Sequence, residues 1–159
     1  MKQILVFALI LLLASCGKKT LFEKERIFEN NTWNRFDKLN FEFPVEKENG
    51  YYNIKLLVKH DGNFEENQLP VYLILNTSSG EERMKEVSFL LKDKGVLQGE
   101  KQENVYSLSK DVWNSIMIAD KGKCTVSIEN IYPKFDSFGI HSVSLVVEKA
   151  EKPKSAEEE

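Results

Sequence analysis

Cysteine and histidine are scarce in this sequence, with two residues of each among 159. Cys16 and Cys124 cannot supply the several disulfides that stabilise many small exported domains. His60 and His141 are too few to form a histidine-rich metal site without added carboxylates. Lysine and arginine gather in no concentrated run, and the net charge is −3. We therefore expect neither a disulfide framework, nor a bound metal, nor a nucleic-acid partner.

The sequence also lacks the common catalytic motifs. It contains no Gly-x-Ser-x-Gly elbow, no glycine-rich phosphate loop and no Cys-x-x-Cys pair. The acidic segment 61–66 has oxygen ligands at alternate positions, but Tyr72 stands where a calcium loop needs a glutamate. We interpret this segment as a loop between two strands. These absences predict a protein that is not an enzyme and that needs no cofactor.

One apolar run is long, the ten residues Ile4–Leu13. As a helix it would rise about 15 Å, roughly half the hydrocarbon thickness of a bilayer, so it is too short for a stable span. It follows Lys2 and ends in Leu-Ala-Ser-Cys at 13–16, which is the order of a lipoprotein signal peptide. We predict cleavage before Cys16 and lipid on its thiol, since acyl chains hold a protein on a membrane without a spanning helix. An ordinary secretory signal or an uncleaved anchor would leave the position of Cys16 unexplained.

The remaining chain is dominated by short segments that favour strands. They are rich in β-branched and aromatic residues, several of them alternating with polar residues at a period of two: residues 39–43, 51–60, 71–75, 84–91, 125–131 and 140–147. The continuous apolar run 71–75 predicts a strand that is buried on both faces. Since no 3.6-residue stripe of helical length is present, we predict an all-β fold. The expected architecture is a single antiparallel β-sandwich, of the jelly-roll or immunoglobulin-like kind, behind the signal peptide.

The expected organisation of the chain has four parts. Residues 1–15 form the lipoprotein signal peptide, and residues 16–30 form a lipidated tether that lifts the domain off the membrane. Residues 31–149 form the β-sandwich domain. Residues 150–159 are rich in lysine and glutamate and cannot bury apolar surface, so they are expected to be a disordered acidic tail.

Three details carry specific expectations. Residues 92–113 are interrupted by glycines, which predicts mostly loop, with a short helical turn capped by Ser109. Cys124 stands in an alternating apolar pattern, which favours a small buried side chain on a strand over a reactive thiol. His141 is expected to face solvent or to satisfy a backbone group.

Aromatic residues crowd the first third of the mature chain. The phase of their strand places Phe41 and Phe43 in the core. We keep Trp33 and Trp113 as candidates for an exposed partner surface. Outward-facing rings could also stack on sugars, so a carbohydrate- or peptidoglycan-binding role stays open beside a protein-binding one.

Several pieces of the mature sequence resemble the GldH family of gliding-motility lipoproteins. The most telling piece is Asn-Asn-Thr-Trp at 30–33, and the resemblance runs from Cys16 to about Lys149. The matching pieces follow in the same order along the chain: Phe28–Arg35, Leu39–Phe43, Ile54–His60, Gly95–Gly99, Val105–Leu108, Gly122–Glu129 and Val143–Glu148.

The resemblance implies a non-enzymatic accessory of the gliding motor and its associated type IX secretion machinery. Such a protein is anchored in the cell envelope and works with other envelope lipoproteins, and the family offers no catalytic residues to carry over. Residues 17–19, Gly-Lys-Lys, lack both an aspartate that would favour inner-membrane retention and an acidic run associated with export to the surface. We therefore expect the protein on the periplasmic leaflet of the outer membrane, held by lipid on Cys16.

Overall fold

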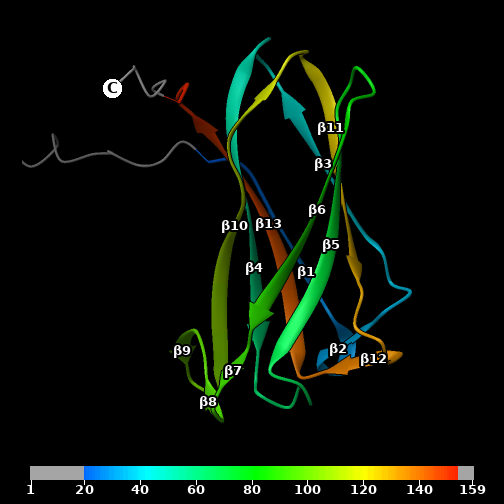
Figure 1. Ribbon diagram of the computed structural model, residues 1–159, viewed down its shortest axis with the longest axis vertical. Coiled ribbons are helices and arrows are strands. Elements are labelled where there is room, and N and C mark those ends of the chain that lie inside the picture. Colours follow the sequence, from blue (N-terminus) through cyan, green and yellow to red (C-terminus); the bar gives the residue numbers. More distant parts are fainter. Residues whose placement is uncertain (1–19, 154–159) are drawn as a thin grey trace, which may run out of the picture.

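The computed structural model describes residues 20–153 and shows two antiparallel β-sheets packed face to face (Figure 1). The signal peptide, the lipid site at Cys16, the first part of the tether and residues 154–159 lie outside the described residues. Within the described part, the one helical element is the 3₁₀ turn η2 (Glu29–Asn31). No helix among these residues is long and apolar enough to cross a membrane.

Two large sheets and two small ones account for the strands. The larger sheet has five strands in the order β1 (Thr20–Ile27), β13 (Ile140–Ala150), β4 (Gly50–His60), β10 (Val105–Ile118) and β9 (Glu100–Gln102). The second has four, in the order β3 (Leu39–Val45), β11 (Gly122–Asn130), β5 (Gln68–Asn76) and β6 (Glu82–Leu90). The small two-stranded sheets pair β2 (Thr32–Asn34) with β12 (Asp136–Phe138), and β7 (Lys92–Asp93) with β8 (Val96–Leu97).

The long strands follow the connection order of a jelly roll. When the eight strands of seven or more residues are numbered along the chain, one sheet reads 1-8-3-6 and the other reads 2-7-4-5. Neighbouring strands run antiparallel throughout both sheets. The prediction of an all-β antiparallel sandwich is confirmed, and the strand order selects the jelly roll over the immunoglobulin-like alternative.

The hydrophobic core lies between the two large sheets because each long strand turns alternate side chains inward. On β4 the inward residues are Tyr52, Ile54, Leu56 and Val58, and on β5 they are Leu69, Val71, Leu73 and Leu75. Each such aliphatic side chain stabilises the fold by about 1.5–3 kcal/mol when fully buried. Cys124 is fully buried on β11, as its alternating pattern predicts.

The expectation of a tether over residues 16–30 is wrong from Thr20 onward. Residues Thr20–Ile27 form β1, which is hydrogen-bonded to β13 at the edge of the five-stranded sheet. Most of its side chains are exposed on both faces, which is possible because an edge strand has a neighbour on one side only. Because Thr20 pairs with Glu148, the chain enters the sandwich beside the point where β13 nears its end at Ala150 (Figure 1).

The expected loop over residues 92–113, with a helical turn near Ser109, is wrong: the first half contains the short strands β7, β8 and β9, and the second half is one long strand. Residues Val105–Ile118 form β10, the longest strand among the described residues. Its pairing with β4 shifts register on either side of Trp113. Each shift interrupts the alternation of inward and outward side chains along β10. Ser115 has a φ of 47°, so the strand bends there and its sequence shows no sustained alternation.

Two smaller expectations are also corrected. The run 71–75 is not buried on both faces, because Tyr72 and Ile74 point away from the core and are partly exposed. The strand predicted over residues 39–43 also continues through Pro44, which lies inside β3. It is tolerated there because β3 is an edge strand, and the missing N–H need not pair with a further neighbour.

One open side of the sandwich is closed by basic side chains. Lys85 Nζ on β6 donates to the Val112 carbonyl oxygen of β10 at 2.6 Å, and Lys110 Nζ on β10 donates to the Ser88 carbonyl oxygen of β6 at 2.7 Å. These bonds join an edge of one sheet to the neighbouring strand of the other. They also occupy carbonyl groups that would otherwise be open to pairing with another chain.

Candidate functional site

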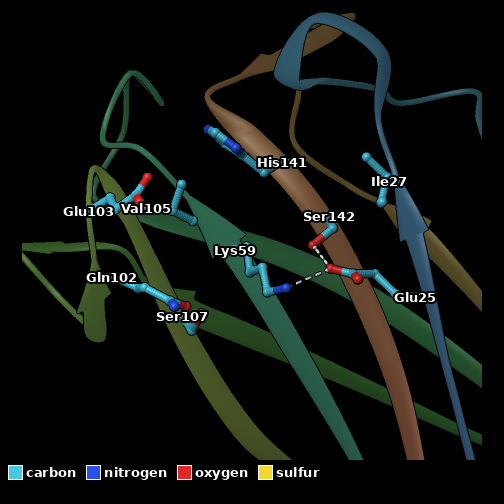
Figure 2. Close-up of a pocket in the computed structure, with 9 residues that line it drawn as sticks. All are labelled: Glu25, Ile27, Lys59, Gln102, Glu103, Val105, Ser107, His141 and Ser142. Atoms are coloured by element: carbon cyan, nitrogen blue, oxygen red, sulfur yellow. Dashed lines mark hydrogen bonds and ion pairs between the residues drawn. The ribbon is translucent and has the colours of Figure 1, made fainter.

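A groove of about 400 Å³ crosses the outer face of the five-stranded sheet near the ends of β1 and β4 (Figure 2). Its lining comes from β1, β4 and β13 and from the β9–β10 hairpin. The residues are Glu25, Ile27, Lys59, Gln102, Glu103, Val105, Ser107, His141 and Ser142. Seven of the nine lining residues have polar or charged side chains, although more of the exposed lining surface is apolar than polar, and none of them is phenylalanine, tyrosine or tryptophan.

The Glu25 carboxylate is the centre of the polar network in this groove. Its Oε1 accepts a hydrogen bond of 2.5 Å from Ser142 Oγ and one of 2.9 Å from Lys59 Nζ (Figure 2). The hydrogen bond from Ser142 has the largest effect on the pKa of Glu25, and that from Lys59 comes next. Together they hold this pKa below its usual value. The Ser142 hydroxyl therefore donates a hydrogen bond to a carboxylate whose lowered pKa makes it a weak base, and no histidine is directed at this hydroxyl to activate it as a nucleophile.

His141 does not complete a catalytic triad with Ser142. Its Nε2 lies 2.9 Å from Asp61 Oδ2, and its ring points away from Ser142 (Figure 2). Burial alone would raise the pKa of Asp61, but hydrogen bonds from the Asn63 backbone N–H and from His141 hold it below its usual value. From the sequence, His141 is expected to face solvent or to satisfy a backbone group. Its side chain is only partly exposed, and its partner is the Asp61 side chain, a contact that fastens the β4–β5 loop to β13.

His60, the other histidine, is part of the core. It is fully buried at the end of β4, and its Nε2 lies 3.0 Å from the Gln98 carbonyl oxygen. Because a carbonyl only accepts, Nε2 carries the proton, and Nδ1 is left with no partner among residues 20–153. Burial lowers the pKa of His60. Within the described residues, no group of three or more histidine, cysteine or acidic residues could hold a metal ion.

Trp33 and Trp113, the two candidates for a partner surface, are both buried. Trp33 has no exposed surface, stacks on Phe28 with ring centroids 5.2 Å apart, and donates from Nε1 to the Asp37 carbonyl oxygen at 2.9 Å. Trp113 is 9% exposed and belongs to the core between the sheets. The interpretation of these rings as an exposed partner surface is contradicted by their burial.

The exposed aromatic residues are phenylalanines at the end of the sandwich that carries β2 and β12. Phe36 is 73% exposed, Phe135 66% and Phe138 52%. The Phe36 and Phe135 rings are 5.7 Å apart, and the Arg35 guanidinium lies 5.8 Å from the Phe36 ring centroid. We call Arg35, Phe36 and Phe135 the aromatic patch. Sequence reasoning missed it, although Phe36 and Phe135 both stand in polar turns outside any alternating segment.

The patch is brought together by pairing between segments far apart in the sequence. β2 and β12 pair antiparallel, and the Arg35 N–H donates to the Phe135 carbonyl oxygen at 2.8 Å. Asn34 Nδ2 donates to Asp136 Oδ1 at 2.9 Å across the same pair. The third predicted site residue, Cys16, lies outside the described residues.

Comparison with known proteins gives one match. Residues 20–147, which include every strand from β1 to most of β13, match the model of a family described as GldH lipoprotein. No curated protein matches the chain. The family match covers well over half of the 159 residues and agrees with the resemblance found in the sequence.

Proposed function

Because the chain belongs to the GldH lipoprotein family, we propose that it is a non-enzymatic accessory component of the gliding-motility and type IX secretion machinery. It acts through contacts with other envelope lipoproteins. The observation that carries the proposal is the family match across the folded domain, from the first residue of β1 to Val147 in β13. Fold alone would not support a function, because jelly rolls serve many roles.

The chemistry of the groove supports a role without catalysis. Glu25 is engaged by Ser142 and Lys59, and His141 is engaged by Asp61. A hydrolytic site would need a base directed at a nucleophile, with donors for a developing negative charge nearby. Here five polar groups bind one another in two separate sets, Glu25 with Ser142 and Lys59, and His141 with Asp61.

Protein binding fits the structure better than sugar binding. Jelly rolls occur among lectin domains, but sugar platforms use exposed aromatic faces beside polar groups. Trp33 and Trp113 are buried, and the groove of Figure 2 has no phenyl or indole ring in its lining. Exposed rings lie instead in the aromatic patch, a setting typical of protein interfaces.

We place the protein on the periplasmic leaflet of the outer membrane, anchored by lipid on Cys16. Membership of a lipoprotein family supports the anchor. With lipid on Cys16, only residues 17–19 separate the acylated residue from Thr20 at the start of β1. Extended chain spans at most about 3.5 Å per residue, so the sandwich would stay within roughly 15 Å of the membrane surface at that point.

Crosslinking in cells tests the proposal. A tagged full-length chain is crosslinked, purified in mild detergent and compared with a Cys16→Ala variant by mass spectrometry. We expect other gliding or secretion lipoproteins to be recovered with the lipidated form and to be depleted with the variant. Recovery of glycan fragments without protein partners would refute the proposal and support the carbohydrate-binding alternative.

A further inference from the structure

The aromatic patch is held rigidly although its rings are exposed. Arg35 Nη1 donates to the Pro133 carbonyl oxygen at 2.7 Å, and the Arg35 N–H donates to the Phe135 carbonyl oxygen at 2.8 Å. The Phe36 N–H donates to Asn34 Oδ1 at 3.0 Å. These bonds fix both turns that carry the phenylalanines, so the two rings keep their 5.7 Å spacing without a covering element. A partner would therefore meet a preorganised surface and would spend little free energy in ordering it.

The composition of the patch is that of an interface centre. Two phenylalanines, each more than half exposed, lie beside an arginine whose guanidinium lies over the Phe36 ring. Aromatic residues and arginine are enriched at the centres of protein interfaces, where lysine and glutamate are depleted. Isolated exposed apolar residues are common on surfaces, but these two rings form a tilted pair with a guanidinium over one of them.

The charges around the patch indicate what a partner must offer. Among residues 20–153, no carboxylate forms an ion pair with Arg35, and the hydrogen bond of its guanidinium goes to the backbone carbonyl of Pro133. Asp136, the acidic residue on β12, accepts from the Asn34 amide. The other charges nearby are already paired within the chain: Arg26 with Asp37, Lys38 with Glu129, and Lys134 with Glu65. Arg35 is thus the one cation of the patch whose charge is not matched by an acidic side chain.

The position of the patch excludes the anchoring membrane as its occupant. β1 begins at Thr20, next to the anchor, and runs eight residues before the chain reaches η2 and β2 (Figure 1). A strand of that length extends about 26 Å. The patch therefore lies toward the opposite end of β1 from the point at which the tether enters the sandwich.

From these observations we infer that the aromatic patch docks a protein partner that presents apolar side chains around a carboxylate. The apolar side chains cover the Phe36 and Phe135 rings, and the carboxylate pairs with the guanidinium of Arg35. This inference rests on the proposed function, because it names the surface and the partner chemistry through which the protein would act.

The test places a photo-reactive benzophenone amino acid at position 36 of the full-length, lipidated chain in cells. Position 84 on β6, where Met84 is also well exposed, carries the same group in a matched control. We expect irradiation at position 36, and not at position 84, to give one major product. The crosslinked peptide of the partner should contain an aspartate or glutamate among apolar residues.

Charge reversal then tests the chemistry of the contact. Arg35→Glu is expected to lower the crosslinked yield about tenfold or more. Truncating a side chain at the centre of an interface, or reversing its charge, commonly lowers the affinity by that factor. Replacing the identified carboxylate of the partner with arginine should restore the yield. The unfolding midpoint of Arg35→Glu, compared with that of wild type, separates lost binding from lost folding, because the substitution also removes the hydrogen bond to the Pro133 carbonyl.

Several outcomes would overturn the inference. These are a product with a second copy of this chain, a product with lipid, a partner peptide without a carboxylate, or a yield no higher than at position 84. Cells that carry Arg35→Glu and still spread and secrete as wild type would also contradict it, provided that deletion of the gene abolishes both activities. If deletion itself leaves spreading and secretion intact, the proposed function fails as well.

Discussion

Replacing Trp33 with alanine is the sharpest test of the packing at the β2–β12 end of the sandwich. The side chain has no exposed surface and stacks on Phe28 with an interplanar angle of 13°. Its Nε1 also donates to the Asp37 carbonyl oxygen at 2.9 Å. The substitution therefore removes a large buried ring, an aromatic contact and a hydrogen bond together.

We expect Trp33→Ala to lower the free energy of unfolding by about 4 kcal/mol. Truncation of a buried tryptophan or phenylalanine to alanine typically costs about 3–5 kcal/mol, which already includes the lost ring contacts. The hydrogen bond adds only about 1 kcal/mol or less, because Asp37 is partly exposed and water can replace the indole donor. A domain of this size has a free energy of unfolding of about 5–15 kcal/mol, so the substitution would remove a large part of it.

Urea unfolding of a soluble chain that starts after Cys16 measures the effect. Circular dichroism reports the unfolding of the sheets, and Trp113 remains as a fluorescence probe. The matched control is Phe36→Ala, which removes an aromatic ring that is 73% exposed and should change the stability by less than about 0.5 kcal/mol. A loss below about 1 kcal/mol for Trp33→Ala, or equal losses for both variants, would refute the packing described for Trp33.

Three further predictions follow from single groups. The free energy of unfolding should fall as the pH is lowered through about 6.5, because burial lowers the pKa of His60 in the folded protein and the unfolded chain binds that proton first. His60→Gln, which can still donate to the Gln98 carbonyl, should weaken this pH dependence in urea titrations between pH 7.5 and 5. Glu25→Gln should lower the free energy of unfolding by less than about 1 kcal/mol at pH 7, since the Glu25 carboxylate is partly exposed. Because the pKa of Glu25 is lowered, the difference from wild type should vanish in acid as the pH falls through that lowered value. Cys124, whose thiol pKa is raised by burial, should react with iodoacetamide only as fast as the native chain unfolds, and faster labelling would contradict its burial.

The sequence predicts well the strands that lie between two long neighbouring strands, or whose apolar and polar residues alternate along their whole length. β4 buries every second residue from Tyr52 to Val58, because one face meets the opposite sheet and the other meets solvent. β1 escaped prediction because an edge strand, exposed on both faces, needs no apolar period. β10 escaped because its two irregularities near Trp113 break the period that marks a strand.

The candidate site was less predictable than the fold. Glu25 and Ser142 are far apart in the sequence and meet only because β1 pairs with β13. Phe36 and Phe135 meet because β2 pairs with β12, and no local sequence pattern predicts that pairing. Contacts of this kind depend on strand order, and a single sequence does not specify which strands become neighbours.

The sequence by itself determined the all-β class, the burial of Cys124 and the membership of a lipoprotein family. Each of these depends on local alternation or on residues in a fixed order along the chain. The alternation of residues 39–43 also placed Phe41 and Phe43 in the core, where both lie. For the aromatic rings outside such a segment, only the tertiary structure decided which lie inside and which lie outside. Alternation shows which residues share a face of a strand, but Trp33 is buried and Phe36 exposed because distant segments cover one ring and leave the other open.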